Sequence, residues 1–88
     1  MGVPEDINWL KENRTRFRTF VAIATEKASK IRELKSYLKI SDWWPVKLHV
    51  KDLVDRGLIA EADGNCRLTE SGQKVLESLL ALRELESI

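Results

Sequence analysis

The sequence is poor in the residues that build metal sites and disulfides. Its 88 residues include one cysteine and one histidine, so an internal disulfide cannot form and a structural zinc site lacks its usual ligands. A low cysteine content suits a reducing compartment. Residues 1–12 carry charges and no apolar region typical of a signal peptide. We therefore expect a cytoplasmic protein with no metal and no cofactor.

Long apolar runs and catalytic motifs are also missing. No apolar segment approaches the roughly 20 residues that span a membrane, so we expect no membrane association. The sequence has no glycine-rich phosphate-binding motif, and no serine, cysteine or acid is placed to act with His49. We interpret His49 as a partly buried packing residue and Cys66 as a small core residue. We expect that the protein is not an enzyme.

Positive charge is concentrated in one part of the chain. The net charge is +1, but residues 11–51 hold eleven lysines and arginines against four acids, a balance of +7. The rest of the chain holds four against ten, a balance of −6. A basic part beside an acidic part is typical of a protein with an anionic partner, nucleic acid first. Solvated helix faces of alternating sign explain the same composition equally well.

The periodicity of apolar residues predicts helices at both ends of the chain. Residues 5–26 form one long helix or two short helices in line. Their apolar stripe has heptad spacing and consists of Ile7, Leu10, Phe17, Val21 and Ala24. Thr69 is placed to cap a last helix that runs from Glu70 to about Leu85, with Gly72 tolerated in its first turn.

The middle of the chain predicts two helices joined by a short break. Ser29 can cap the first of them. After a break at residues 40–42, Ser41 or Asp42 can cap the second, which ends at Gly57 because glycine readily takes the left-handed conformation. The inward faces are predicted to hold Ile31, Leu34 and Leu38 in the first helix and Val46, Val50, Leu53 and Val54 in the second.

A hairpin is predicted before the last helix. Residues 58–62 and 66–68 are the expected strands, and Asp63-Gly64-Asn65 between them is a strong tight-turn pattern. The predicted fold is one mainly α domain over residues 1–88, in the order helix-helix-helix-strand-strand-helix. A short break between two helices, followed by a two-stranded wing, is the pattern of a winged helix-turn-helix domain.

Three segments resemble the winged helix-turn-helix transcription regulators of archaea and bacteria. Residues 53–59 (Leu-Val-Asp-Arg-Gly-Leu-Ile) are similar to the family's exit from the recognition helix into the wing. Residues 68–72 (Leu-Thr-Glu-Ser-Gly) are similar to its entry into the last helix, and the apolar face of residues 31–38 to its helix-two core. The resemblance covers about residues 14–80. It departs from the family at residues 42–45, Asp-Trp-Trp-Pro, where small polar residues are usual.

The resemblance implies sequence-specific binding of double-stranded DNA by a transcription regulator, with the third helix in the major groove. Lys47 and Lys51 lie one turn apart on the outward arc of this helix and can meet phosphates or a guanine edge. The family often contacts the phosphate backbone near the start of its second helix. The predicted DNA-binding residues are Lys30, Arg32, Ser41, Trp43, Trp44, Lys47, Lys51 and Arg67.

The tryptophan pair favours a second hypothesis. Exposed tryptophans are uncommon and are enriched at interfaces. We expect one of Trp43 and Trp44 to close the core and the other to form an apolar spot with Leu48. Anchoring through Trp44 and Leu48 would make the domain a winged-helix protein–protein interaction module within a larger complex. The wing carries Glu61 and Asp63, so it gives DNA binding little support.

The last helix predicts a homodimer. Its apolar residues cover more than half of the helical wheel, whereas packing on the helix's own core needs a stripe of roughly 100°. We expect residues 70–88 and the stripe within 5–26 to be dimerisation elements, so that two recognition helices face neighbouring half-sites. The predicted interface residues are Leu79, Leu82, Leu85 and Ile88.

Overall fold

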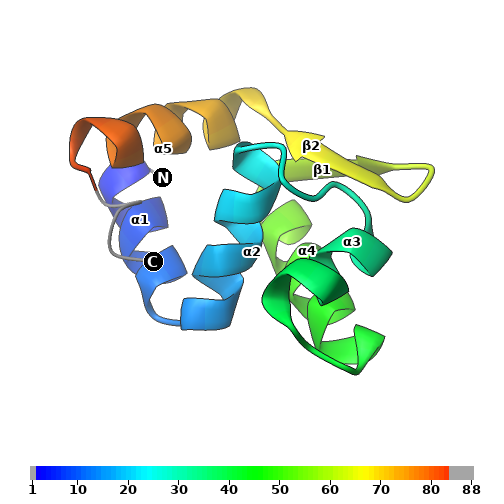
Figure 1. Cartoon of the computed structure of the whole chain (residues 1–88). Helices are drawn as coiled ribbons and strands as arrows, with labels where there is room; N and C mark the ends of the chain where they lie inside the picture. Colours follow the sequence, from blue (N-terminus) through cyan, green and yellow to red (C-terminus); the bar gives the residue numbers. More distant parts are fainter. Residues whose placement is uncertain (1, 84–88) are drawn as a thin grey trace.

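The computed structural model describes residues 2–83. This part of the chain is a mainly helical domain with five helices and a two-stranded antiparallel hairpin before the last helix (Figure 1). The elements are α1 (Val3–Lys11), α2 (Arg14–Ala24), α3 (Ile31–Leu38), α4 (Trp43–Asp55), β1 (Ile59–Ala62), β2 (Asn65–Leu68) and α5 (Glu70–Ala81). None of the described helices is long and apolar enough to cross a membrane.

The N-terminal segment is two helices that reverse on each other, so the prediction of one long helix or two in line is wrong. The backbone of Asn13 is extended, and its side chain caps α2 by accepting a 3.0 Å hydrogen bond from the N–H of Arg16. The chain reverses at this point, and α1 and α2 lie side by side (Figure 1). The predicted stripe is shared between both helices, and all of it is buried: Ile7, Leu10, Phe17, Val21 and Ala24. The stripe therefore offers no exposed surface to a second subunit.

Helices α3 and α4 are joined by residues 39–42. Asp42 caps α4 by accepting a 3.1 Å hydrogen bond from the N–H of Trp44, so of the two predicted caps the aspartate is used. Pro45 follows in the first turn, where its missing N–H costs little. Helix α4 ends before Gly57, whose φ of +83° confirms the expected left-handed residue.

The hairpin forms as predicted. Asp63 and Gly64 both have positive φ, 54° and 79°, which a two-residue turn of this kind requires. The register pairs Ile59 with Leu68 at the base of the hairpin. The chain before α3 forms an isolated bridge with β2 between Lys30 and Asn65, and the N–H of Cys66 donates a 2.7 Å hydrogen bond to the carbonyl of Ser29. The start of α3 is thereby tied to the hairpin.

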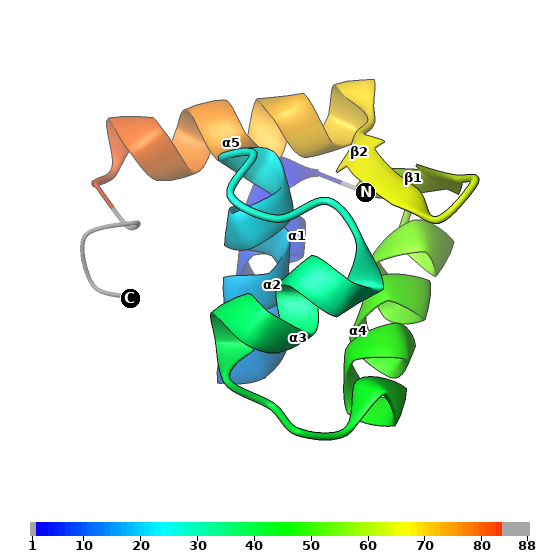
Figure 2. The ribbon, with the colours of Figure 1, turned by 45° about the vertical axis from the view of Figure 1, so that its right-hand side comes forward.

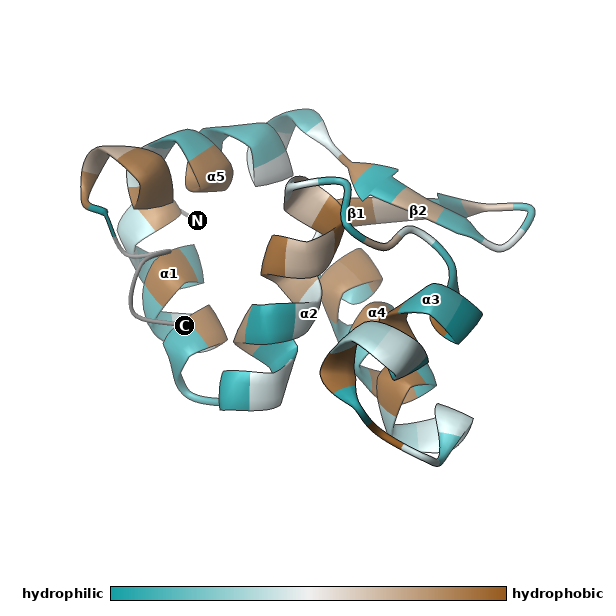
Figure 3. Cartoon of the chain, in the orientation of Figure 1, coloured by the Kyte–Doolittle hydropathy of each residue, from teal (hydrophilic) through white to brown (hydrophobic). Residues whose placement is uncertain are grey.

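Helix α5 closes the core by packing on α1, α2 and β2 (Figure 2). Leu79 is fully buried in this core, so its assignment to a dimer interface is wrong. Leu80 and Leu82, by contrast, are 55% and 62% exposed at the end of the helix, where the ribbon is apolar (Figure 3). The remaining predicted interface residues, Leu85 and Ile88, lie outside the described part of the chain.

Candidate functional site

The candidate site is the outer surface of α3, the 39–42 turn and α4. Helix α4 buries Val46, Val50 and Leu53 against the core, as predicted. Val54 was expected on the same inward face, but it is 37% exposed. Val54 is therefore part of the outer surface, as is Leu48, which is 42% exposed.

Both tryptophans at the start of α4 are exposed, so the prediction that one of them closes the core is wrong. Trp43 is 50% and Trp44 is 52% exposed. The two rings touch edge to face, with centroids 5.5 Å apart and planes at 85°. The two residues border different hollows: Trp43 lines one beside α3, and Trp44 lines one beside β1.

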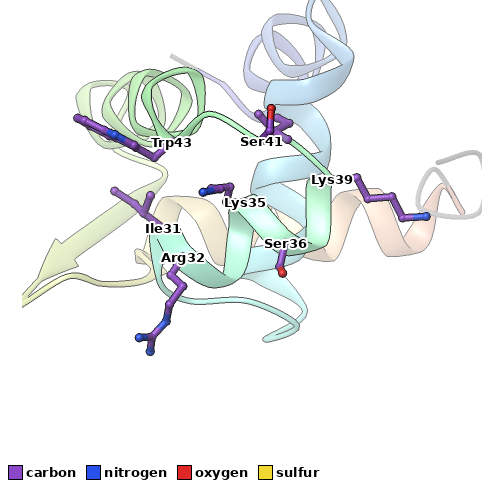
Figure 4. A pocket seen from close by; sticks show the side chains of 8 residues that line it. Ile31, Arg32, Lys35, Ser36, Lys39, Ser41 and Trp43 are labelled. Atoms are coloured by element: carbon purple, nitrogen blue, oxygen red, sulfur yellow. The ribbon is translucent and has the colours of Figure 1, made fainter.

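The first hollow, the α3–α4 groove, has a volume of about 670 Å³ (Figure 4). It is lined by Ile31, Arg32, Lys35, Ser36, Lys39, Ile40, Ser41 and Trp43, of which three are basic and none is acidic. The Lys35 side chain points toward the side of Trp43, whereas Arg32 and Lys39 extend outward (Figure 4). None of these three cations makes a hydrogen bond or an ion pair with any residue in the range 2–83. The groove is therefore a surface of unneutralised positive charge.

The second hollow, the α4–β1 groove, is smaller and more apolar. Its volume is about 210 Å³, and it is lined by Trp44, Lys47, Leu48, Val50, Lys51, Val54 and Glu61. The Lys51 ammonium donates a 2.6 Å hydrogen bond to Asp55, which raises the pKa of Lys51. Lys47 instead has its Nζ 5.5 Å from the centroid of the Trp43 ring. Of the two predicted lysines, Lys47 is the one whose charge has no carboxylate partner among the described residues.

The start of α3 is organised by Glu33, which sequence reasoning missed. Its carboxylate accepts hydrogen bonds from the N–H groups of Ser29 (2.9 Å) and Lys30 (3.3 Å). The bond from Ser29 is the main reason that the pKa of Glu33 is lowered. Lys30, and not Ser29 as predicted, is the N-cap residue. The predicted phosphate-binding residue Lys30 thus lies beside a fixed negative charge.

Two of the groove cations, Lys35 and Lys39, were not among the predicted site residues. Lys39 is the left-handed C-cap residue that follows α3, with a φ of 58°, so helical spacing does not place it. Lys35 lies three positions after Arg32, which places these two residues on one face of α3. This periodicity was the available signal for Lys35. Arg67, which was predicted, lines a separate depression with Glu26 and Gln73, so the structure does not bring it together with the α4 residues.

His49 and Cys66 have the packing positions expected of them. His49 is partly buried, and burial followed by the charge of Arg16 lowers its pKa despite the nearby Asp52. Cys66 is buried, which raises its pKa to about 11. Within residues 2–83 no group of three or more histidines, cysteines, aspartates or glutamates is placed to hold a metal ion.

Comparison with known proteins finds no match: no protein-family model, no curated protein and no solved structure is significantly similar to the chain. The function therefore rests on the two grooves and their charges. The α3–α4 groove has the chemistry of an anion-binding surface, and the α4–β1 groove has that of an apolar contact surface.

Proposed function

We propose that the chain is a winged helix-turn-helix domain that binds double-stranded DNA sequence-specifically, as a homodimeric transcription regulator. The observation that carries this proposal is a set of cations on α3, its C-cap and α4 that have no acidic partner among residues 2–83: Arg32, Lys35, Lys39 and Lys47. The order α3, short turn, α4 and hairpin supports it as well.

In this proposal α4 enters the major groove, which is about 12 Å wide and admits one helix. Lys47 contacts base edges or phosphates from the exposed face of α4. Arg32 and Lys35 on α3 contact the phosphate backbone, together with the C-cap residue Lys39. Lys51 can also contact a phosphate once its ion pair with Asp55 breaks. Breaking this pair costs little free energy, because both side chains are more than half exposed.

The test is fluorescence anisotropy of a labelled duplex at several salt concentrations. Binding should weaken steeply with salt, because each phosphate contact releases counterions. Lys47→Glu should weaken binding at least about tenfold, since it replaces a phosphate contact with a repulsive charge. The matched control is Lys74→Glu on α5, whose lysine lies 3.9 Å from Glu70, outside both grooves. Absence of binding to any duplex at low salt would overturn the proposal.

Sequence specificity and symmetry need a second measurement. Selection from a random duplex pool should recover a palindrome, because a two-fold dimer presents one recognition helix to each half-site. Recovery of unrelated sequences would reduce the proposal to non-specific DNA binding.

A protein-interaction module is the second candidate, and the α4–β1 groove favours it. Trp44, Leu48 and Val54 are all exposed around this groove, and exposed aromatic side chains are common interface anchors. Charge reversal at Arg32 and Lys35, which line the α3–α4 groove and not the α4–β1 groove, separates the two candidates. It should abolish duplex binding in the first and leave capture of a protein partner little changed in the second.

A further inference from the structure

We infer that the α3–α4 groove holds an unpaired nucleotide of a single strand, with the base against Trp43 and the phosphate against Lys35. This goes beyond duplex recognition. A base inside a duplex is stacked on its neighbours, so it must leave the stack before it can lie on an indole ring.

The charge of the groove points to an anionic occupant. Arg32, Lys35 and Lys39 line it without an acidic neighbour in its wall. Three cations elsewhere in the described chain have an acidic neighbour: Arg16 lies 3.8 Å from Glu12, Arg56 lies 2.9 Å from Asp6, and Lys74 lies 3.9 Å from Glu70. The groove cations have no such partner in the part of the chain that the structure describes. A strand of phosphates would supply the missing negative charge along α3.

The wall of the groove points to a flat aromatic group beside that charge. Trp43 is half exposed, and Ile31 borders the same hollow from α3. Lys47 lies over the Trp43 ring but does not line the groove. Trp9, in contrast, is already covered by the guanidinium groups of Arg16 and Arg56, 3.8 and 4.8 Å from its centroid. The Trp43 ring thus has room for a stacking partner that Trp9 lacks.

The size and polarity of the groove fit a nucleotide. Its volume of about 670 Å³ gives a nucleotide room to lie along its surface. Lys35 points toward the side of Trp43, so a phosphate on its ammonium leaves the attached base close to the indole ring (Figure 4). The Ser41 hydroxyl in the same lining can hydrogen-bond a base or a sugar. Stacking accepts any base, so little sequence preference is expected from this groove.

The experiment compares two labelled single strands of about 12 nucleotides, within the range of known single-strand sites. One strand is oligothymidylate, and the other has the same phosphates and sugars but no bases. The full chain should bind oligothymidylate about tenfold more tightly, because only this strand can stack on Trp43. Lys35→Gln should weaken binding of both strands alike, because it removes a phosphate contact.

Variants of the two tryptophans then locate the stacking. Trp43→Ala should lose the roughly tenfold preference for the strand with bases, and Trp43→Phe should keep most of it. Trp44→Ala is the matched control, since Trp44 is equally exposed but does not line the groove. If Trp43→Ala does not fold, the affinities for the two strands are still compared in the unmodified chain and in Trp43→Phe, and this comparison tests the inference.

Equal binding of the two strands by the unmodified chain overturns the inference. The inference is also overturned if Trp44→Ala and Trp43→Ala lose the preference for the strand with bases to the same extent. A blunt duplex measured in parallel keeps this result apart from the proposed function. Duplex binding without a preference for the strand with bases overturns the inference alone. That preference without any duplex binding supports the inference and overturns the duplex proposal.

Discussion

Asp6 and Arg56, fifty residues apart, form an ion pair with 2.9 Å between Oδ1 and Nε. Their side chains are 11% and 18% exposed, so water screens the pair little. Arg56 is the C-cap residue of α4, and its guanidinium also lies over the Trp9 ring of α1. The end of the helix that displays the candidate site is therefore anchored to the N-terminal helix.

Asp6→Asn should lower the free energy of unfolding by about 2 kcal/mol, because a hydrogen bond to a charged group contributes roughly 1.5–3 kcal/mol. Urea denaturation followed by circular dichroism measures the change. The matched control is Asp63→Asn, at a turn residue whose φ of 54° suits asparagine. Equal destabilisation by both substitutions would show that the ion pair contributes nothing specific.

Gly72→Ala should destabilise the domain by at least about 2 kcal/mol. A Cβ at Gly72 would lie 2.0 Å from the carbonyl oxygen of Leu58, so α5 and the start of the hairpin would have to separate. Thermal unfolding of this variant beside Ser71→Ala, at an exposed position of the same helix turn, checks the prediction. A Gly72→Ala protein as stable as Ser71→Ala would contradict the close approach.

Features that depend on local chemistry were predictable from the sequence. Gly57, the turn at residues 63–64 and the Thr69 cap each satisfy a backbone requirement with their own residue type, and all three are confirmed. Asn13 carried the same kind of information, since an N-cap residue inside an apolar stripe marks a new helix. The heptad spacing continues across Asn13, and it concealed the boundary between α1 and α2, because the apolar residues of two antiparallel helices can fall on one stripe.

Features that depend on what packs across the chain were not predictable. The helical wheel of α5 identifies its leucines, but the position of α1 and α2 decides that Leu79 is buried and Leu82 exposed. The exposure of Trp43 depends on how far α3 lies from α4, which no local pattern encodes. Gly72 was expected to be merely tolerated, yet the nearness of Leu58 excludes any side chain there.

Cys66 should be almost unreactive in the native protein. Burial, followed by the charge of Glu61, raises its pKa from 9.0 to about 11, so at pH 8 the native thiolate fraction is about a hundredfold below that of the unfolded chain. Labelling with a thiol reagent should therefore be slow until urea unfolds the domain. The buried neutral thiol stabilises the fold fully below about pH 9, and this contribution is lost as pH rises toward 11. Rapid native labelling at pH 8 would argue against a buried Cys66.

The homodimer remains a prediction, and Leu80 and Leu82 carry it in the described chain. Leu82→Glu should weaken dimerisation at least about tenfold, because it places a charge in an apolar contact. Sedimentation velocity at several protein concentrations gives the mass. Leu48→Glu on α4, also at an exposed leucine, should leave the mass unchanged. An unmodified chain that is monomeric at every concentration would contradict the prediction.

Glu61 should limit DNA affinity, because it places a carboxylate in the lining of the α4–β1 groove beside Lys47 and Lys51. Glu61→Lys should tighten duplex binding several-fold and steepen the logarithmic salt dependence by about 0.9, the value of one additional phosphate contact. Anisotropy titrations at several salt concentrations measure both quantities. Glu77→Lys on α5 changes the net charge equally, outside both grooves. If both variants tighten binding alike, net charge explains the gain, and the α4–β1 face does not contact DNA.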